Sequence, residues 1–281
     1  MTQIRTTHVG SLIRTPLIIE AMRASEAGDP VDDAAFETEL QHAVKDVVKK
    51  QVETGIDVPS DGEFGKRGWT QYVGERLSGL TRDAGAPTRA MAAMSMDRDR
   101  FGDFYREYAA FERLLWLPEE TQEKIRQTEV RTAGTGWRVT SPITYVGQEA
   151  VARDIVNFKA ALASAGHSDG FLPVVAPCSV AAGRANDFYK SDEEYLYAIA
   201  DALREEYLAI ANAGLTLQVD DAFLPVEGRV WTDMDGFRRW ATIRQEALNH
   251  ALRGIPEEQV RYHICWGLRV ESYWVRRSNT W

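Results

Sequence analysis

Apolar residues recur every three to five positions in several long stretches of the chain, and this spacing predicts amphipathic helices. Asp32 and Asp33 precede the first of these stretches as candidate helix caps, and Gly55 is its expected end. Asp192 is the candidate cap of the third stretch, which Gly214 ends. The predicted helices cover residues 36–52, 151–162, 195–210 and 234–252.

Short apolar runs separate these helices, and each run predicts a β-strand, in one case with a loop attached. The runs lie at residues 4–8, 56–59, 139–146, 171–176, 215–219 and 261–265. Because strand and helix alternate, we expect a parallel sheet with helices outside it. The alternation of strand and helix is interrupted between about Gly65 and Glu129. We interpret this stretch as a helical insertion with its own apolar face. A lid or a partner surface is the alternative for this insertion.

Composition limits the classes of function that this fold can serve. With 281 residues and 44% hydrophobic content, the chain can bury a large core, as one α/β barrel-sized domain or as two smaller ones. A net charge of -9 and a pI near 5.2 argue against a surface for nucleic acid or anionic membrane. No apolar run is long enough to span a bilayer, and the N-terminus lacks a signal-peptide pattern. We therefore expect a cytoplasmic protein.

His263 and Cys265 are the first candidates for chemistry. Residues two apart in a strand point to the same side, so the imidazole and the sulfur are presented together. A thiolate beside an imidazole suits zinc better than magnesium or calcium, so the pair is half of a metal site. Cys178 is the only other cysteine, which leaves no disulfide framework and favours a reducing compartment. A buried strand with a small apolar cysteine and a hydrogen-bonded histidine remains the alternative.

Further polar residues follow the predicted strands directly. Ser11, Glu63, Ser179 and Asp220 all come at carboxyl ends of strands, as does the pair at the last strand. Parallel α/β barrels and open sheets bind their ligands at this end. We therefore expect these side chains to converge on one mouth, although each acid taken alone could also be a helix cap or a turn residue.

Four short motifs, in this order and spacing, resemble the catalytic barrel of cobalamin-independent methionine synthase and its single-domain relatives. They are Thr6-Thr-His-Val-Gly-Ser11, Asp61-Gly-Glu-Phe64, Gln218-Val-Asp-Asp221 and Tyr262-His-Ile-Cys265. The resemblance implies a TIM-type (β/α) barrel and a zinc-dependent methyltransferase that methylates the thiol of homocysteine to give methionine. The methyl donor would be a methyl-folate or a methyl-corrinoid.

The same resemblance assigns roles to individual residues. It implies that Gly10, Ser11, Glu63 and Asp220 bind the amino-acid thiol and that His263 and Cys265 are zinc ligands. Two carboxylates can pair with the ammonium group of such a substrate. The implied partners are a small-molecule thiol and a methyl donor. We expect no nucleic acid and no membrane among the partners.

The end of the chain departs from the family pattern. We expect a barrel domain over residues 1–267, with the insertion after the second strand at about 65–129, and an atypical tail over 268–281. Such a barrel would be incomplete, about two strand–helix units short of the eight that close it, with open edges through which copies could associate. The family's further ligands and the histidine used in methyl transfer would lie past Trp281. Alkylation of another thiol such as coenzyme M, and a non-catalytic fragment, are the alternative functions.

Overall fold

The computed structural model describes residues 4–83, 100–104, 136–228, 231 and 233–265. The predicted tail and most of the predicted insertion lie outside these residues. The described start of the insertion contains a short helix, α3 (Val73–Arg76), and a strand, β1 (Leu80–Arg82). The division into a barrel domain and a tail therefore stays a prediction.

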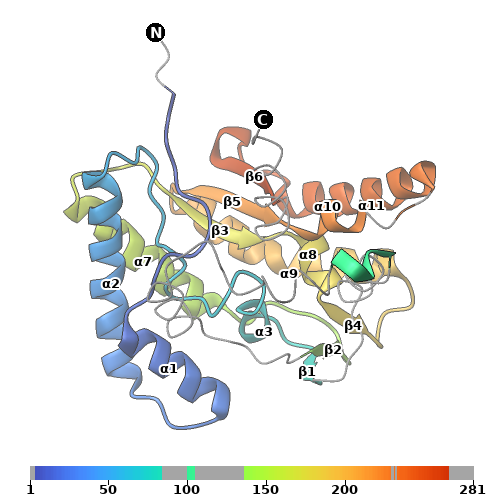
Figure 1. Cartoon of the computed structure of the whole chain (residues 1–281), viewed down its shortest axis with the longest axis horizontal. Coiled ribbons are helices and arrows are strands. Elements are labelled where there is room, and N and C mark those ends of the chain that lie inside the picture. Colours follow the sequence, from blue (N-terminus) through green and yellow to red (C-terminus); the bar gives the residue numbers. More distant parts are fainter. Residues whose placement is uncertain (1–3, 84–99, 105–135, 229–230, 232, 266–281) are drawn as a thin grey trace.

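Three parallel strands form the centre of the α/β fold (Figure 1). They are β3 (Phe171–Val175), β5 (Thr216–Asp221) and β6 (Val260–Ile264), with β5 in the middle. The sequence predicted all three, because apolar or β-branched residues fill β3 and recur along β5 and β6. Every residue of β3 is buried, whereas β6 alternates between half-buried and exposed residues.

The N-terminal segments continue this sheet through single bridges. Thr7 pairs with Val58, and Ser60 pairs with Phe171 at the start of β3, both in parallel. The segments predicted as strands at 4–8 and 56–59 are therefore parallel neighbours of the sheet, but they form isolated bridges in place of a continuous hydrogen-bonded ladder. These parallel segments and strands form a curved row. Its two ends are joined by a hydrogen bond, which Arg261 of β6 donates from Nη1 to Thr7 Oγ1 at 3.3 Å.

A second small sheet corrects the prediction of a parallel strand at 139–146. Here β2 (Trp137–Val139) pairs antiparallel with β1 and parallel with β4 (Arg184–Asn186). The strand ends early because Pro142 follows it and has no backbone N–H to donate to a ladder. The apolar residues after it make only one bridge, from Tyr145 to Leu77.

Helices surround the central sheet as the periodicity predicted. Figure 1 shows α2 beside α7 at one end of the molecule and α11 at the other. The longer helices are α1 (Pro16–Ala27), α2 (Asp33–Glu53), α7 (Gln148–Ser164), α9 (Asp192–Asn212) and α11 (Met234–Leu252). The short ones are α8 (Pro177–Ala182), α10 (Phe223–Gly228) and the 3-10 helix η1 (Glu257–Gln259). Within the described residues, no helix is long and apolar enough to cross a membrane.

Cap residues agree with the sequence at one helix and not at another. Asp32 accepts from the backbone N–H of Ala35 at 3.0 Å, which confirms its predicted role. Asp192 was predicted to cap α9, but it is the first helical residue. Ser191 is the cap, because its backbone is extended and its hydroxyl accepts from the N–H of Glu194 at 3.1 Å.

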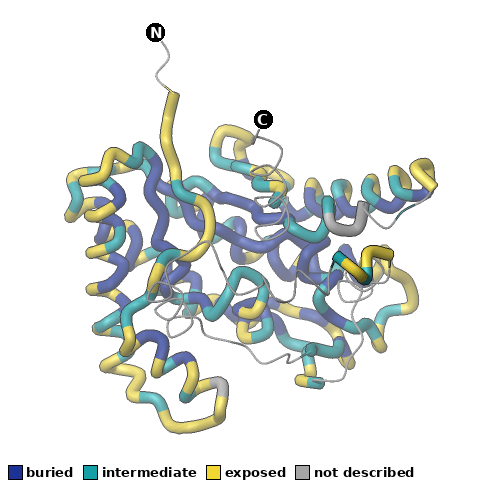
Figure 2. Tube along the Cα trace, in the orientation of Figure 1, coloured by how far each residue is buried: buried dark blue, intermediate teal, exposed yellow. Residues whose placement is uncertain are grey.

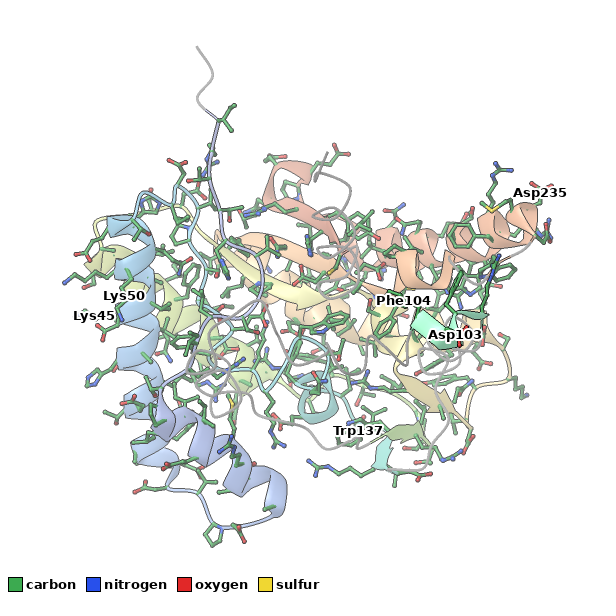
Figure 3. The ribbon with its side chains drawn as sticks, in the orientation of Figure 1. Lys45, Lys50, Asp103, Phe104, Trp137 and Asp235 are labelled. Atoms are coloured by element: carbon green, nitrogen blue, oxygen red, sulfur yellow. The ribbon has the colours of Figure 1, made fainter. Side chains whose placement is uncertain are left out.

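The core lies between the sheet and the inner faces of these helices (Figure 2). Phe158, Leu203 and Tyr207 are fully buried there. The Tyr207 hydroxyl also donates to the backbone oxygen of Val175 at 2.6 Å and so ties α9 to the end of β3. Charged side chains such as Lys45 and Lys50 project from the outer side of α2 (Figure 3).

Candidate active site

The site begins with a sharp turn after the bridge at Ser60. The α2 side chain of Gln51 holds the backbone of Ser60 from both sides, donating to its oxygen at 2.8 Å and accepting from its N–H at 3.0 Å. Gly62 and Glu63 then adopt φ of 68° and 59°. A left-handed glutamate is uncommon and costs on the order of 1 kcal/mol, and such strain concentrates at functional positions.

This turn presents Glu63 to the N-terminal segment. Ser11 Oγ donates to Glu63 Oε2 at 2.6 Å, and Glu63 itself is buried. Arg14 stabilises the turn by donating to the backbone oxygens of Glu63 and Lys66, at 2.9 and 2.7 Å. Gly10 has a φ of 92°, which favours glycine, and the space where its side chain would lie is open. The structure thus brings Ser11 and Glu63 together, with Gly10 beside Ser11.

Asp220 lies near the end of β5 on the same side of the molecule. Its pKa is raised to about 7, first by burial and next by the negative charge of Glu63. Gln218 opposes this rise by donating from Nε2 to Asp220 Oδ1 at 2.9 Å. Because the charge of Glu63 acts on Asp220, the two predicted acids lie near each other.

Three charged residues of the site were not predicted. Lys66 is buried and donates from Nζ to the backbone oxygen of Pro173 in β3. Asp61 is buried too, and its pKa is raised to about 6 by burial, which Lys66 opposes. Arg261 of β6 lowers the pKa of Asp220. The sequence carried a weak signal for Lys66 and Asp61, since both flank the Gly-Glu-Phe motif, and none for the charge pairing between them.

Ser179 takes a different position from the one predicted. It is fully buried, and its hydroxyl donates to Asp221 Oδ1 at 2.7 Å. The Ser179 hydroxyl oxygen also accepts from the backbone N–H of Phe223 at 3.3 Å. These bonds join α8 to the end of β5, so Ser179 contributes to the frame of the site and has no open hydroxyl.

His263 and Cys265 lie on the strand next to Asp220. His263 is paired with Asp220 in the register of β5 and β6, and the Cys265 N–H donates to the backbone oxygen of Asp221 at 3.3 Å. Both residues are half-buried, whereas Tyr262 and Ile264 are exposed. The alternation agrees with one shared side for the imidazole and the sulfur. Burial, and then the charge of Arg261, lower the pKa of His263, which favours the neutral imidazole.

The donor types of this pair fit zinc, but they supply only half of a site. A tetrahedral zinc site needs four ligands. Within the described part of the chain, no group of three or more histidine, cysteine, aspartate or glutamate side chains is placed to hold a metal ion. His263 and Cys265 alone therefore do not complete such a site.

Two buried polar atoms near the predicted site have no hydrogen-bond partner. They are Nε2 of His8, three residues before Ser11, and Oε1 of Gln218, two residues before Asp220. Unpaired buried polar atoms are costly, and they are common where a ligand or water completes the bonding. Their position agrees with a ligand that binds at the carboxyl ends of these strands.

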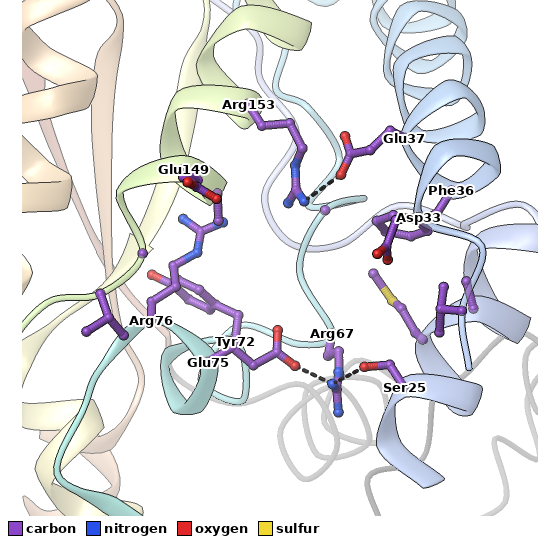
Figure 4. A pocket seen from close by; sticks show the side chains of 17 residues that line it. Ser25, Asp33, Phe36, Glu37, Arg67, Tyr72, Glu75, Arg76, Glu149 and Arg153 are labelled. Atoms are coloured by element: carbon purple, nitrogen blue, oxygen red, sulfur yellow. Dashed lines mark hydrogen bonds and ion pairs between the residues drawn. The ribbon is translucent and has the colours of Figure 1, made fainter. Parts of the chain in front are cut away.

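A cavity of about 580 Å³ lies elsewhere, between α1, α2, α3 and α7 (Figure 4). Several of its charged lining residues pair with one another. Arg153 donates to Glu37 at 3.0 Å, and Arg67 pairs with Glu75 and donates to Ser25 at 3.0 Å. None of its lining residues is a histidine or a cysteine, and neither Glu63 nor Asp220 lines it. This cavity is therefore distinct from the predicted site.

Comparison with known proteins supports the resemblance found in the motifs. The family model for the catalytic domain of cobalamin-independent synthase matches residues 4–95, a range that includes Ser11 and Glu63. An uncharacterized protein, YxjH, of Bacillus subtilis is 26% identical over 96% of this chain. A methionine synthase of Sulfolobus acidocaldarius is 22% identical over 95% of this chain. The chain spans 63% and 62% of the lengths of these two relatives.

Solved structures agree at the level of the fold. A B12-independent methionine synthase from Shewanella sp. W3-18-1, in complex with selenomethionine, has a TM-score of 0.61 and 17% identity and covers 98% of this chain. A putative vitamin-B12 independent methionine synthase from Listeria monocytogenes has a TM-score of 0.61 and 18% identity and covers 95% of it. This chain covers 65% and 67% of those two chains. By these matches together, the chain is similar to cobalamin-independent methionine synthases, and its residues 4–95 match the catalytic domain of that family.

Proposed function

We propose that the chain binds homocysteine in a methyltransferase that transfers a methyl group to the homocysteine thiol and so makes methionine. The observation that carries this proposal is the convergence of Ser11, Glu63 and Asp220 at the carboxyl ends of neighbouring parallel segments, beside the strand of His263. The donor would be a methyl-folate or a methyl-corrinoid. A cytoplasmic location agrees with this role and stays a prediction.

The substrate's ammonium group would lie between Glu63 and Asp220. Two buried carboxylates repel each other, and a cation placed between them relieves that repulsion. The Glu63 carboxylate already accepts from Ser11, which fixes its orientation, and Gln218 fixes that of Asp220 in the same way. Gly10 leaves open space next to Ser11 for the rest of the amino acid.

We propose zinc as the cofactor, held by His263 and Cys265 together with ligands outside the described residues. Bound zinc would lower the pKa of the substrate thiol, so that the thiolate forms at neutral pH. The neutral imidazole that burial favours at His263 is the form that can ligate a metal. Both side chains are half-buried, so they remain accessible to a ligand at the carboxyl ends of the strands.

The proposal includes a TIM-type barrel as the full architecture. Support comes from the parallel order of the segments at Thr7, Val58 and Ser60 with β3, β5 and β6. The contact from Arg261 to Thr7 across the row indicates the curvature that a barrel requires. A barrel places the residues after each strand around one mouth, as the proposed substrate site needs.

Thiol selectivity tests the proposed activity. The zinc-supplemented full chain should convert homocysteine to methionine with methyltetrahydrofolate triglutamate or with methylcobalamin as donor, measured by mass spectrometry. Methyl transfer to coenzyme M should be far slower, because that thiol has no ammonium group for the two carboxylates. Equal rates for both thiols would favour a general thiol alkyltransferase, and the absence of product from either would favour a non-catalytic fragment.

Metal content tests the proposed ligands. Replacing Cys265 by serine should weaken zinc binding by at least about tenfold. Even the loss of a group that only hydrogen-bonds to a metal ligand reduces metal affinity by about that factor. Cys178→Ala is the matched control, because Cys178 is the other cysteine of the chain and lies buried in α8. With only two of the proposed ligands among the described residues, we expect the unaltered chain to bind zinc weakly or below one equivalent, as plasma emission spectrometry would measure. Tight, stoichiometric zinc that survives Cys265→Ser would place the metal elsewhere.

A further inference from the structure

A second cavity, of about 400 Å³, lies among α8, β4, α9 and α11. None of the residues of the proposed homocysteine site lines it. Its wall is partly apolar, with Leu196, Ala181 and the ring of Trp240, and partly cationic, with three arginines. The arginines differ in how their charges are compensated, and this difference indicates what the cavity binds.

Arg138 and Arg244 both have carboxylate partners. Arg138 bonds Asp83 at 3.0 Å and also Asp187. Arg244 lies 3.6 Å from Asp192 and stacks over the Trp240 ring at 3.9 Å. These two cations are therefore neutralised within the protein, at least in part.

Arg184 is buried and has no such partner. It is 5% exposed, and its terminal nitrogens donate only to backbone oxygens, of Val180 at 3.1 Å and of Thr70 at 2.9 Å. Its Nε has no hydrogen-bond partner, and in the described part of the chain no carboxylate pairs with it. Burying an unpaired charge is unfavourable, which is reflected in the lowered pKa that burial gives Arg184.

Tyr195 adds a second unsatisfied donor to the same cavity. It is 4% exposed, and its hydroxyl has no hydrogen-bond partner. The ring is held in place by stacking on Tyr189, with centroids 5.9 Å apart. Tyr195 and Arg184 are close enough to interact electrostatically. Two neighbouring residues that line the cavity therefore each have a buried donor atom without an acceptor.

We propose that this cavity binds a small monocarboxylate, whose oxygens accept from Arg184 Nε and the Tyr195 hydroxyl. A carboxylate supplies two acceptor oxygens and one negative charge, and the guanidinium edge is a good partner for it. Of the three arginines, Arg184 is the one without a carboxylate partner among the described residues, and the carboxylate of a ligand would neutralise its charge. Water would satisfy the donors but would leave that charge. The apolar wall favours a ligand with a hydrocarbon body.

Calorimetric titration of the full chain with benzoate tests this proposal, with benzamide as the neutral analogue of the same shape. Benzoate should bind saturably, while benzamide and inorganic phosphate at the same ionic strength should bind at least about tenfold more weakly. Replacing Tyr195 by phenylalanine removes only the unsatisfied hydroxyl and should weaken benzoate binding about fivefold, the equivalent of one hydrogen bond. Arg184→Gln should weaken it more.

Tyr197→Phe is the matched control, because Tyr197 lies on the same helix and does not line the cavity. It should leave benzoate affinity unchanged. The proposal is overturned if benzoate does not saturate, if benzamide binds equally well, or if the Tyr195 and Tyr197 variants lose equal affinity. Because Tyr195→Phe removes an unpaired buried group, it should fold as the original chain does, so the test holds even if Arg184→Gln does not fold.

Discussion

Replacing Arg76 by methionine should lower the free energy of unfolding by about 3–5 kcal/mol, as measured by urea denaturation followed by circular dichroism. Arg76 is buried, donates to Glu206 at 2.6 Å and also pairs with Asp154. Its guanidinium stacks over the ring of Tyr72 with 4.9 Å to the centroid. Methionine keeps much of the packing volume, so the expected loss comes mainly from the charges.

The size of the effect follows from the two carboxylates that remain. Glu206 is fully buried, and one of its oxygens already has no hydrogen-bond partner. Burial raises the pKa of Asp154, but the charges of Arg76, Arg153 and Lys66 together lower it by more, so the net shift is downward. Without Arg76, Glu206 loses the cation that pairs with it, while Asp154 retains Arg153 at 3.0 Å. An uncompensated buried carboxylate is therefore the main cost.

Arg138→Met is the matched control for Arg76→Met. Arg138 also bridges two carboxylates, Asp83 and Asp187, but their side chains are 39% and 48% exposed. Exposed ion pairs contribute little, so this variant should lose much less stability than Arg76→Met. Adding Glu206→Gln to Arg76→Met should recover part of the lost stability, because the residual buried charge is then removed. Equal losses for the two arginine variants, or no recovery, would contradict the buried-charge explanation.

Sequence reasoning located the helices and the ends of the main strands well, for local reasons. The spacing of apolar residues in α2 and α9 is set by which face each helix buries. This pattern can be recognised in the sequence alone. The same holds for β5, whose buried run from Leu217 to Asp221 includes the predicted Asp220. Since these elements are parallel neighbours, the positions of Ser11 and Glu63 near Asp220 followed from strand order.

The missed features depend on contacts that no local pattern encodes. Gln51 holds the turn at Ser60 from a helix that precedes it, and a glutamine in a helix gives no sign of such a role. Lys66 looks like a solvent-exposed cation in sequence, yet it is buried against Pro173. The early end of β2 depends on where a proline interrupts a ladder whose partners lie far away in the chain. Buried charges are therefore predictable only once the packing of the elements is known.

Glu63→Gln and Asp220→Asn should each weaken homocysteine binding by about 10- to 100-fold, which corresponds to one charge-assisted hydrogen bond to the ammonium group. Both changes are nearly isosteric and leave a carbonyl oxygen in place. The Glu63 variant can still accept from Ser11, and the Asp220 variant can still accept from Gln218. Unfolding curves should therefore change little, while calorimetric titration in the presence of zinc should show the loss of affinity.

A ligand comparison separates this role from a structural one. The thiol 4-mercaptobutanoate has the carboxylate and sulfur of homocysteine but no amino group, so both variants should bind it nearly as well as the unaltered chain does. Asp187→Asn, at an exposed acid paired with Arg138, should leave both affinities unchanged. Equal losses for the two thiols would instead indicate that the acids shape the site or support the metal.

The double variant Glu63→Gln with Asp220→Asn tests the two carboxylates together. Each single variant still has one carboxylate to pair with the ammonium group, so homocysteine should retain part of its advantage over 4-mercaptobutanoate. With both carboxylates neutral, no proposed partner for that group remains, and the advantage should disappear. If the double variant still prefers homocysteine, the ammonium group binds elsewhere and the proposed roles of Glu63 and Asp220 are wrong.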